Sequence, residues 1–279
     1  MFLAGGLSAC RARTGNRPDH QSDQTRSRPT LQNCRTFFFF PSPEARETNT
    51  RPKCLSKDWH CPDHVSFANI HPGHKPFDVI TLTYNSKNEL CKTDESGTCP
   101  DAVDCRAELA WNETRQLQQT LWPAHCIIND PESELDDSLL TKEDDHFVLK
   151  GSRCSVDSYS AFFDNARFES TGLHDHLRGR GITRVFVAGL ALDYCVKYTA
   201  LDAKSLGYDV YVVVDATRGT SPSSAERAIE ELKNSGVRLI NSSEIEKCFK
   251  KKKNGSVVAV TLLLVAAALL VRRAKKRTQ

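Results

Sequence analysis

The chain has 279 residues, which suffices for one domain of about 200 residues with tails or for two small domains. Hydrophobic residues make up 39% of it and charged residues 26%, values that are ordinary for a globular protein with an apolar core. The formal net charge is only +3, with most of the basic excess at the two ends, so the central part lacks the basic field that nucleic-acid binding requires.

The cysteines also bear on the class of protein. There are 11 of them, an odd number, and no two form a CxxC pair. In a chain of this length the pattern predicts free thiols in a reducing compartment rather than a disulfide framework. The spacings typical of zinc fingers are absent as well.

Residues 1–53 are predicted to form a disordered, basic region. The segment RARTGNRPDHQSDQTRSRPT is rich in arginine, serine and proline and has almost no apolar periodicity, so it cannot bury enough surface to fold. The arginine excess over residues 1–43 also suits a transit peptide, and this alternative stays open. The run FFFF at Phe37 to Phe40 is either a strand or an artefact of the coding sequence.

Residues 54–248 are predicted to form one α/β domain, because strand and helix patterns alternate there. Strands are expected at 146–151, 183–190, 208–216 and 237–240, and helices at 172–179, 193–207 and 221–236. Repeated β–α–β units of this length predict a doubly wound, mostly parallel sheet with right-handed connections. Functional residues of such sheets gather at the carboxyl ends of the strands.

The carboxyl-terminal end is predicted to anchor the chain in a membrane. The segment SVVAVTLLLVAAALLV, Ser256 to Val271, carries no charge and lies between a basic linker at 249–255 and a basic tail at 272–279. Sixteen residues give about 24 Å of helix, and flanking lysines and arginines can extend this toward the ~30 Å of a bilayer core. A single membrane helix with the catalytic domain in the cytosol is expected, and the organelle is left open.

Two residues are candidates for covalent chemistry. Cys195 follows the expected strand 183–190, in the first turn of the next helix, where the helix dipole and free N–H groups favour a thiolate and can bind an oxyanion. Lys150 ends the expected strand 146–151, where an ammonium could stabilise such a thiolate. The alternatives are a small buried cysteine and a surface lysine.

A short segment near residue 60 could bind a metal. The run KDWHCPDHVSF contains Asp58, His60 and His64 within seven positions, and LWPAHC adds His125 far downstream. An Asp, His, His set with open coordination positions suits zinc, manganese or iron. An ordinary solvated loop is the alternative.

The motifs DWHCPDHVSF, LWPAHC, LKG…VDSYSAFFDN and VAGLALDYCVKYTALDAKSLGYDVYVVVDATRG resemble, in this order, those of the nicotinamidases of the isochorismatase-like hydrolase superfamily. The resemblance covers about residues 57–245. It implies hydrolysis of nicotinamide to nicotinate and ammonia through a cysteine thioester, in NAD salvage. A homo-oligomer is left open.

The resemblance also assigns roles to individual residues. It implies that Cys195 is the nucleophile and Lys150 its charge partner. It also implies a divalent metal, with zinc expected first and manganese or iron as alternatives. The expected ligands are Asp58, His60 and His125, with His64 as a further histidine beside them.

Four more residues follow from the same resemblance. A cis peptide bond is implied between Leu190 and Ala191, and the N–H groups of Ala191 and Cys195 would form the oxyanion hole. Trp122 and Tyr159 are similar to the aromatic walls of the family's pyridine pocket.

The sequence departs from the family ahead of Lys57. In the family, a first strand carries an aspartate in a D-x-Q-x-D-F-like segment, and this aspartate shuttles protons for the cysteine. Asp19 and Asp23 lie in polar sequence that does not match it, so the first strand is expected to be missing or replaced, with RTFFFFP as the candidate. Two alternatives follow: a membrane-tethered, catalytically impaired nicotinamide-binding protein, or another amidohydrolase of the superfamily.

Overall fold

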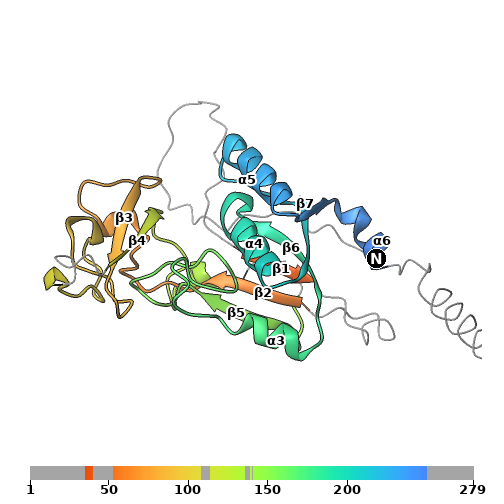
Figure 1. Cartoon of the computed structure of the whole chain (residues 1–279), viewed down its shortest axis with the longest axis horizontal. Helices are drawn as coiled ribbons and strands as arrows, with labels where there is room; N and C mark the ends of the chain where they lie inside the picture. Colours follow the sequence, from red (N-terminus) through yellow and green to blue (C-terminus); the bar gives the residue numbers. More distant parts are fainter. Residues whose placement is uncertain (1–34, 40–52, 108–113, 136–138, 140, 250–279) are drawn as a thin grey trace, which may run out of the picture. The chain divides into compact units, whose positions relative to one another are not determined.

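The computed structural model describes residues 35–39, 53–107, 114–135, 139 and 141–249 (Figure 1). The strands are β1 (Arg35–Phe39), β2 (Lys53–Asp58), β3 (Val79–Tyr84), β4 (Arg115–Thr120), β5 (His146–Lys150), β6 (Arg184–Leu190), β7 (Asp209–Arg218) and β8 (Arg238–Ile240). The helices are α3 (Leu173–Gly179), α4 (Lys197–Ser205), α5 (Pro222–Asn234) and α6 (Ile245–Phe249). Short helical turns are η1 (Ala68–Ile70), η2 (Asp94–Ser96), η3 (Pro131–Ser133), η4 (Leu192–Val196) and η5 (Ser242–Glu244).

Six strands form one sheet in the order β5-β2-β1-β6-β7-β8. β2 is parallel to β5, and β7 is parallel to both β6 and β8. β1 is antiparallel to both of its neighbours, so the other five strands run in one direction. The predicted α/β class and the mostly parallel sheet are confirmed.

β1 occupies the centre of the sheet, where the first strand was expected to be missing or replaced. It comes from the RTFFFFP segment within the region predicted to be disordered, and Phe37 pairs with Leu55 on one side and Ala188 on the other. Because β1 runs against the other strands, its first residue, Arg35, lies at the edge where those strands have their carboxyl ends. β1 thus pairs with both neighbours in the centre of the sheet, but it contains no acidic residue that could replace the family's aspartate.

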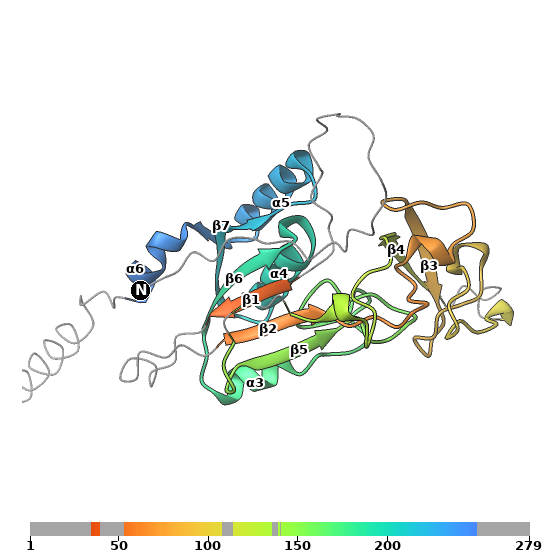
Figure 2. The same ribbon diagram turned by 180° about the vertical axis from the view of Figure 1, so that it is seen from behind.

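Helices α3, α4 and α5 pack on the same face of this sheet (Figure 1). Leu177, Ala200 and Leu232 from the three helices join one apolar cluster with Val185 and Val212 of the strands. The chain crosses the sheet in one direction from β5 through β6 and β7 to β8, and right-handed connections made in one direction put their helices on one face. Figure 2 shows β1, β2 and β5 from behind. A doubly wound sheet, with helices on both faces, is therefore not seen in the described residues.

The sequence patterns predicted the elements of the carboxyl-terminal half correctly, apart from their ends. α5 begins as expected after Ser221, whose side chain accepts a hydrogen bond from the N–H of Ser224, with Pro222 in the first turn. The helix expected from residue 193 begins instead as the π turn η4, which then continues into α4. α6 lies in a second unit that starts at Ser243. The predicted domain limits of 54 and 248 remain a prediction.

A second, smaller sheet is formed by β3 and β4, which pair as antiparallel strands. Its apolar cluster includes Leu82, Tyr84 and Leu121, all completely buried. The Tyr84 hydroxyl donates a 2.9 Å hydrogen bond to the Ser155 carbonyl, which ties this sheet to the segment after β5. The chain leaving β4 carries Trp122 and His125, so this small sheet helps to position two of the predicted site residues.

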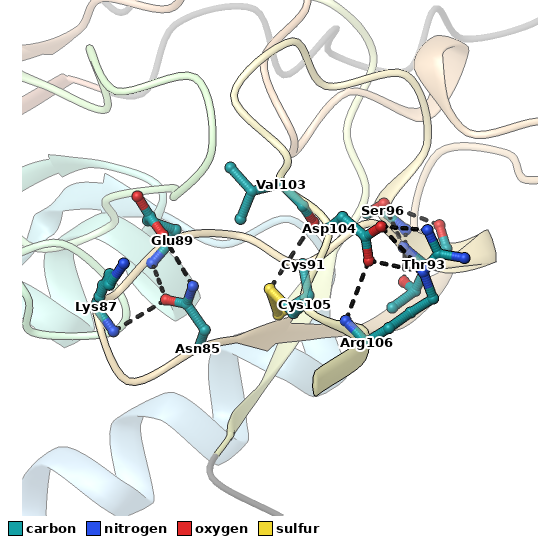
Figure 3. Close-up of a disulfide and its surroundings, with 10 residues drawn as sticks. All are labelled: Asn85, Lys87, Glu89, Cys91, Thr93, Ser96, Val103, Asp104, Cys105 and Arg106. Carbon is teal, nitrogen blue, oxygen red and sulfur yellow. Dashed lines mark hydrogen bonds and ion pairs between the residues drawn. A yellow bond between two sulfur atoms is a disulfide. The ribbon is translucent and has the colours of Figure 1, made fainter. Parts of the chain in front are cut away.

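Two disulfides contradict the prediction of free thiols. Cys61 is bonded to Cys154, and Cys91 is bonded to Cys105. Figure 3 shows the second pair in the loop after β3, beside the hydrogen bonds that connect Asn85 with Glu89. The odd number of cysteines was misleading because only some of them pair. The paired residues are 93 and 14 positions apart, so the absence of CxxC motifs gave no information about them. Among the described cysteines, Cys54, Cys99 and Cys195 are free thiols.

The predicted membrane helix, Ser256 to Val271, and the basic tail after it lie outside the described residues. Within the described part of the chain, no helix is long and apolar enough to span a bilayer. The longest helix there, α5, has 13 residues, whereas about 20 apolar residues are needed to cross. On this finding the predicted membrane localisation is wrong.

Candidate active site

The ends of three strands bring the predicted catalytic residues together. Asp58 is the last residue of β2, Lys150 is the last residue of β5, and Cys195 lies in η4 directly after β6. Because these strands run in the same direction, their carboxyl ends share one edge of the sheet. Lys150 Nζ donates to Cys195 Sγ at 3.5 Å and forms an ion pair with Asp58 Oδ1.

Lys150 is buried, which excludes the alternative of a surface lysine. Only 2% of it is exposed, and its ammonium also donates a 2.8 Å hydrogen bond to the Ser158 carbonyl. Burial by itself raises the pKa of Asp58, but the Lys150 ammonium and the neighbouring His60 and His125 together outweigh this and hold that pKa below its ordinary value. A buried ion pair with these hydrogen bonds therefore lies directly beside the thiol of Cys195.

Asp58, His60 and His125 form a set of donors that fits a metal ion. Their ligand atoms lie within 4.8 Å of one another. His60 Nδ1 hydrogen-bonds the Gly151 carbonyl at 2.8 Å, and His125 Nδ1 hydrogen-bonds the Pro123 carbonyl at 2.8 Å. Because a carbonyl only accepts, both Nδ1 atoms carry the proton and both Nε2 lone pairs remain available to a cation.

His64 lies beside this set. Its ring centroid is 4.1 Å from that of His60, and its Nδ1 contacts Ser66 Oγ at 2.7 Å. Its Nε2 is completely buried and has no hydrogen-bond partner among the described residues. Burial lowers the pKa of His60 to about 4 and that of His64 to about 3, so both rings are neutral and can act as ligands. The residues at this edge therefore fit a divalent cation.

Gly151 allows the close packing of His60. Its φ is +67°, in the left-handed region, and a Cβ added to it would meet His60 Cε1 at 2.4 Å. The glycine thus gives the imidazole room beside the end of β5. Gly151 directly follows Lys150 in the sequence, but no sequence pattern indicated that it would contact His60.

The turn that carries Cys195 is held by a residue that the sequence analysis did not single out. The peptide bond between Leu190 and Ala191 is cis, as expected. Asp193 is buried and accepts a 3.0 Å hydrogen bond from the N–H of Thr220, together with bonds from the Thr220 and Ser224 hydroxyls. Asp193 therefore ties the Cys195 turn to the start of α5.

The two predicted aromatic walls contact one another. Trp122 Nε1 donates a 3.3 Å hydrogen bond to the Tyr159 hydroxyl. Gln119 Nε2 donates to the same hydroxyl at 3.1 Å and to Asp157 Oδ2 at 2.9 Å. Neither Gln119 nor Asp157 was predicted. Asp157 lies in the VDSYSAFFDN motif, whereas Gln119 is one of several glutamines in a polar strand and carries no signal of its own.

The predicted residues enclose a small cavity of about 10 Å³. It is lined by Asp58, His60, Trp122, His125, Lys150, Asp157, Ser158, Tyr159, Tyr194 and Cys195. A wider hollow of about 500 Å³ lies along residues 92–102. None of the predicted site residues reaches the wider hollow, so the concentration of reactive groups identifies the small cavity as the candidate active site.

Comparison with known proteins defines the class. The Isochorismatase domain matches residues 102–244. The chain is 39% identical over 189 residues to a nicotinamidase of Schizosaccharomyces pombe, covering 68% of this chain and 73% of that protein. It is 34% identical over 192 residues to a nicotinamidase of Acinetobacter baylyi, covering 68% and 75%. The chain therefore belongs to the isochorismatase family of hydrolases.

Solved structures point in the same direction. The structure of the yeast nicotinamidase bound to the inhibitor nicotinaldehyde has a TM-score of 0.55 and 29% sequence identity, covering 68% of this chain and 79% of that one. A nicotinamidase and pyrazinamidase of Acinetobacter baumanii has a TM-score of 0.55 and 32% identity, covering 69% and 78%. Within the family, the similarity is thus to its amidohydrolases.

Proposed function

We propose that the protein hydrolyses nicotinamide to nicotinate and ammonia, a reaction of NAD salvage, with Cys195 as its nucleophile. The observation that carries this proposal is the buried Lys150 ammonium, which contacts Cys195 Sγ at 3.5 Å and pairs with Asp58 in the same cavity. A positive charge beside a nucleophilic sulfur stabilises the negative charge that develops during its attack. The nicotinamidases among the relatives support the choice of substrate.

The reaction would run in two halves. Cys195 Sγ attacks the amide carbon, a C–S bond forms, and the carbonyl oxygen becomes an oxyanion that the N–H groups of Ala191 and Cys195 stabilise. The C–N bond then breaks, and the nitrogen leaves as ammonia with a proton from Lys150, the charged N–H donor in contact with the sulfur, while the proton lost by the Cys195 thiol replaces it on Lys150. Water then attacks the thioester and the C–S bond breaks. One proton of the water restores the thiol, the other is released to solution, and nicotinate leaves.

The proposal includes a divalent cation at Asp58, His60 and His125, with His64 beside them. Its support is the chemistry of the donors: two histidines whose Nδ1 atoms already bond backbone carbonyls, and a buried His64 Nε2 without a partner in the described chain. Such an ion would supply Lewis acidity and fixed positive charge to the cavity. Zinc suits this set, and manganese and iron are the alternatives.

A second candidate function is nicotinamide binding with little turnover. One observation favours it: β1 fills the central slot of the sheet with the sequence RTFFF, which offers no carboxylate. If no other group replaces the family's aspartate, general acid–base help worth about 10²–10⁴-fold would be lost. The two functions share the pocket and differ in the rate of amide cleavage.

The test measures ammonia release from nicotinamide by the full chain loaded with zinc, together with equilibrium binding of nicotinamide. Cys195→Ala is the blank, and Cys54→Ala is a matched control because Cys54 is also a buried free cysteine but does not line the cavity. Turnover that disappears only in Cys195→Ala supports hydrolysis. Binding without turnover supports the second candidate, and the absence of both refutes both.

A further inference from the structure

The cavity is too small for the proposed substrate. Its volume is about 10 Å³, which is near the ~10–15 Å³ needed for a single water molecule, whereas ligand pockets measure about 300–1,000 Å³. Part of the wall must therefore move before an aromatic amide can reach Cys195. This inference rests on the proposed function for the identity of the amide.

Tyr194 is the part of the wall that faces solvent. Of the ten described residues that line the cavity, nine are buried and Tyr194 alone is partly exposed. It directly precedes Cys195 in η4. Tyr194 thus both lines the cavity of the reactive thiol and is in contact with solvent.

The contacts of Tyr194 close the cavity against the two aromatic walls. Its ring centroid lies 4.6 Å from that of Trp122 at an angle of 83°, and 5.2 Å from that of Tyr159 at 70°. Both are edge-to-face contacts within the range of about 4.5–7 Å that aromatic pairs prefer. A planar aromatic ring that entered the cavity could take over these contacts when Tyr194 moves away.

The other walls are held more firmly than Tyr194. The hydroxyl of Tyr159 is held by both Gln119 Nε2 and Trp122 Nε1 in buried hydrogen bonds. The Tyr194 hydroxyl interacts with the side chain of Thr120, which is itself partly exposed, so water can replace this partner when the ring turns outward.

We propose that Tyr194 is the gate of the cavity and determines which amides reach Cys195. In the closed state its ring packs on Trp122 and Tyr159. In the open state the ring has turned toward solvent, and the space it leaves admits a small planar aromatic carboxamide. Substituents that extend beyond such a ring would collide with the returning Tyr194, so the residue selects by size.

The first test measures access to Cys195 without requiring turnover. Alkylation of the Cys195 thiol is followed by peptide mass spectrometry with a small reagent, iodoacetamide, and a bulky one, N-phenylmaleimide. Tyr194→Ala should raise the rate with both reagents by about tenfold or more, because neither reagent fits the closed cavity and an open state populated to about 10% or less becomes the only state. Tyr198→Ala is the matched control, since Tyr198 lies one turn later, is exposed, and does not line the cavity.

The second test compares kcat/KM for nicotinamide and for 5-methylnicotinamide. Tyr194→Ala should shift the ratio toward the larger amide, and Tyr194→Phe, which keeps the ring, should stay near the wild type. If Tyr194→Ala fails to fold, as judged by circular dichroism, Tyr194→Leu replaces it with the same expected results. Unchanged labelling of Cys195 in the folded variant overturns the gate.

The two tests separate this inference from the proposed function. Faster labelling of Cys195 by the bulky reagent, without hydrolysis of nicotinamide by the wild type, means that the gate stands and the proposed substrate is wrong. Hydrolysis by the wild type, with equal labelling in Tyr194→Ala and Tyr198→Ala, means that the function stands and the gate is wrong.

Discussion

Replacing Gly151 with alanine tests the candidate metal centre directly, because this glycine touches the ring of His60. Its φ of +67° disfavours any L side chain. A Cβ there would lie 2.4 Å from His60 Cε1 and 2.7 Å from His60 Nδ1. Both distances are shorter than any normal contact, so in Gly151→Ala the imidazole must shift relative to Asp58 and His125.

Two separate costs follow from this geometry. A Cβ in the left-handed region lowers the free energy of unfolding by about 1–2 kcal/mol. The shifted ring also loses the 2.8 Å hydrogen bond between His60 Nδ1 and the Gly151 carbonyl, which orients it. Losing such an orienting contact lowers metal affinity by about 10–100-fold. Gly172→Ala is the matched control, because its φ is +82° and no described atom lies within 4 Å of the added Cβ.

Zinc affinity is measured by competition with a chromogenic chelator, and stability by urea unfolding of the same samples without metal. Both variants should lose a similar free energy of unfolding from the backbone, and only Gly151→Ala should lose zinc affinity. Equal zinc affinity in the two variants would refute His60 as a ligand and with it the proposed donor set.

Three further predictions concern the core, the lysine and pH. Leu82→Ala should lower the free energy of unfolding, measured in urea, by about 2–5 kcal/mol, because Leu82 is fully buried in the apolar cluster of the β3–β4 sheet. Val79→Ala is the control: Val79 is exposed, so the free energy should change by less than about 0.5 kcal/mol. Similar losses in the two variants would contradict the existence of this cluster. Lys150→Met, checked for folding by circular dichroism, should reduce ammonia release by about 10²–10⁴-fold because it removes the N–H donor beside the sulfur, and unchanged release would eliminate this role. When a chelator has removed the metal, burial keeps the pKa of His60 at about 4 and that of His64 at about 3. Between pH 6.5 and these values, only the unfolded chain takes up the two protons. The free energy of unfolding should be highest above pH 6.5 and fall toward pH 4, and a flat profile would contradict the burial of the two rings.

The residues that meet in the cavity could be predicted because their chemistry coincides with strand ends. Lys150 lies at the end of an expected strand and Cys195 follows another, and parallel strands bring such ends to one edge. Asp58 was found by its spacing to His60 and His64, because no strand was expected ahead of it. His60 was found because it lies two residues after Asp58. His125 was assigned through the family resemblance, since its distance along the chain hides its proximity to the other donors.

Other features had no local signal. The direction of β1 depends on pairing with strands distant in sequence, and RTFFF suits either direction. The disulfide between Cys61 and Cys154 joins residues 93 positions apart. In the sequence, Tyr194 is one more aromatic residue beside the nucleophile. Only its packing against Trp122 in the folded chain shows that it forms part of the cavity wall. Each of these features is set by tertiary contacts.

The helices illustrate how a correct local prediction can lead to a wrong arrangement. The patterns identified α3, α4 and α5, but repeated β–α–β units alone do not fix the faces they cover. All three connections cross the sheet in the same direction, so all three helices lie on one side. The order of the strands was the missing information, and it comes from pairing over long distances.

The central claim is that Cys195 forms a covalent bond to the acyl group of nicotinamide. It is tested most directly by mixing zinc-loaded full-length protein with nicotinamide, quenching in acid at short times, and measuring the mass of the peptide that contains Cys195. We expect a nicotinoyl thioester on Cys195 that forms and decays as ammonia and nicotinate accumulate. Nicotinate formed at the same rate by Cys195→Ala, with no acylated peptide in the wild type, would contradict it.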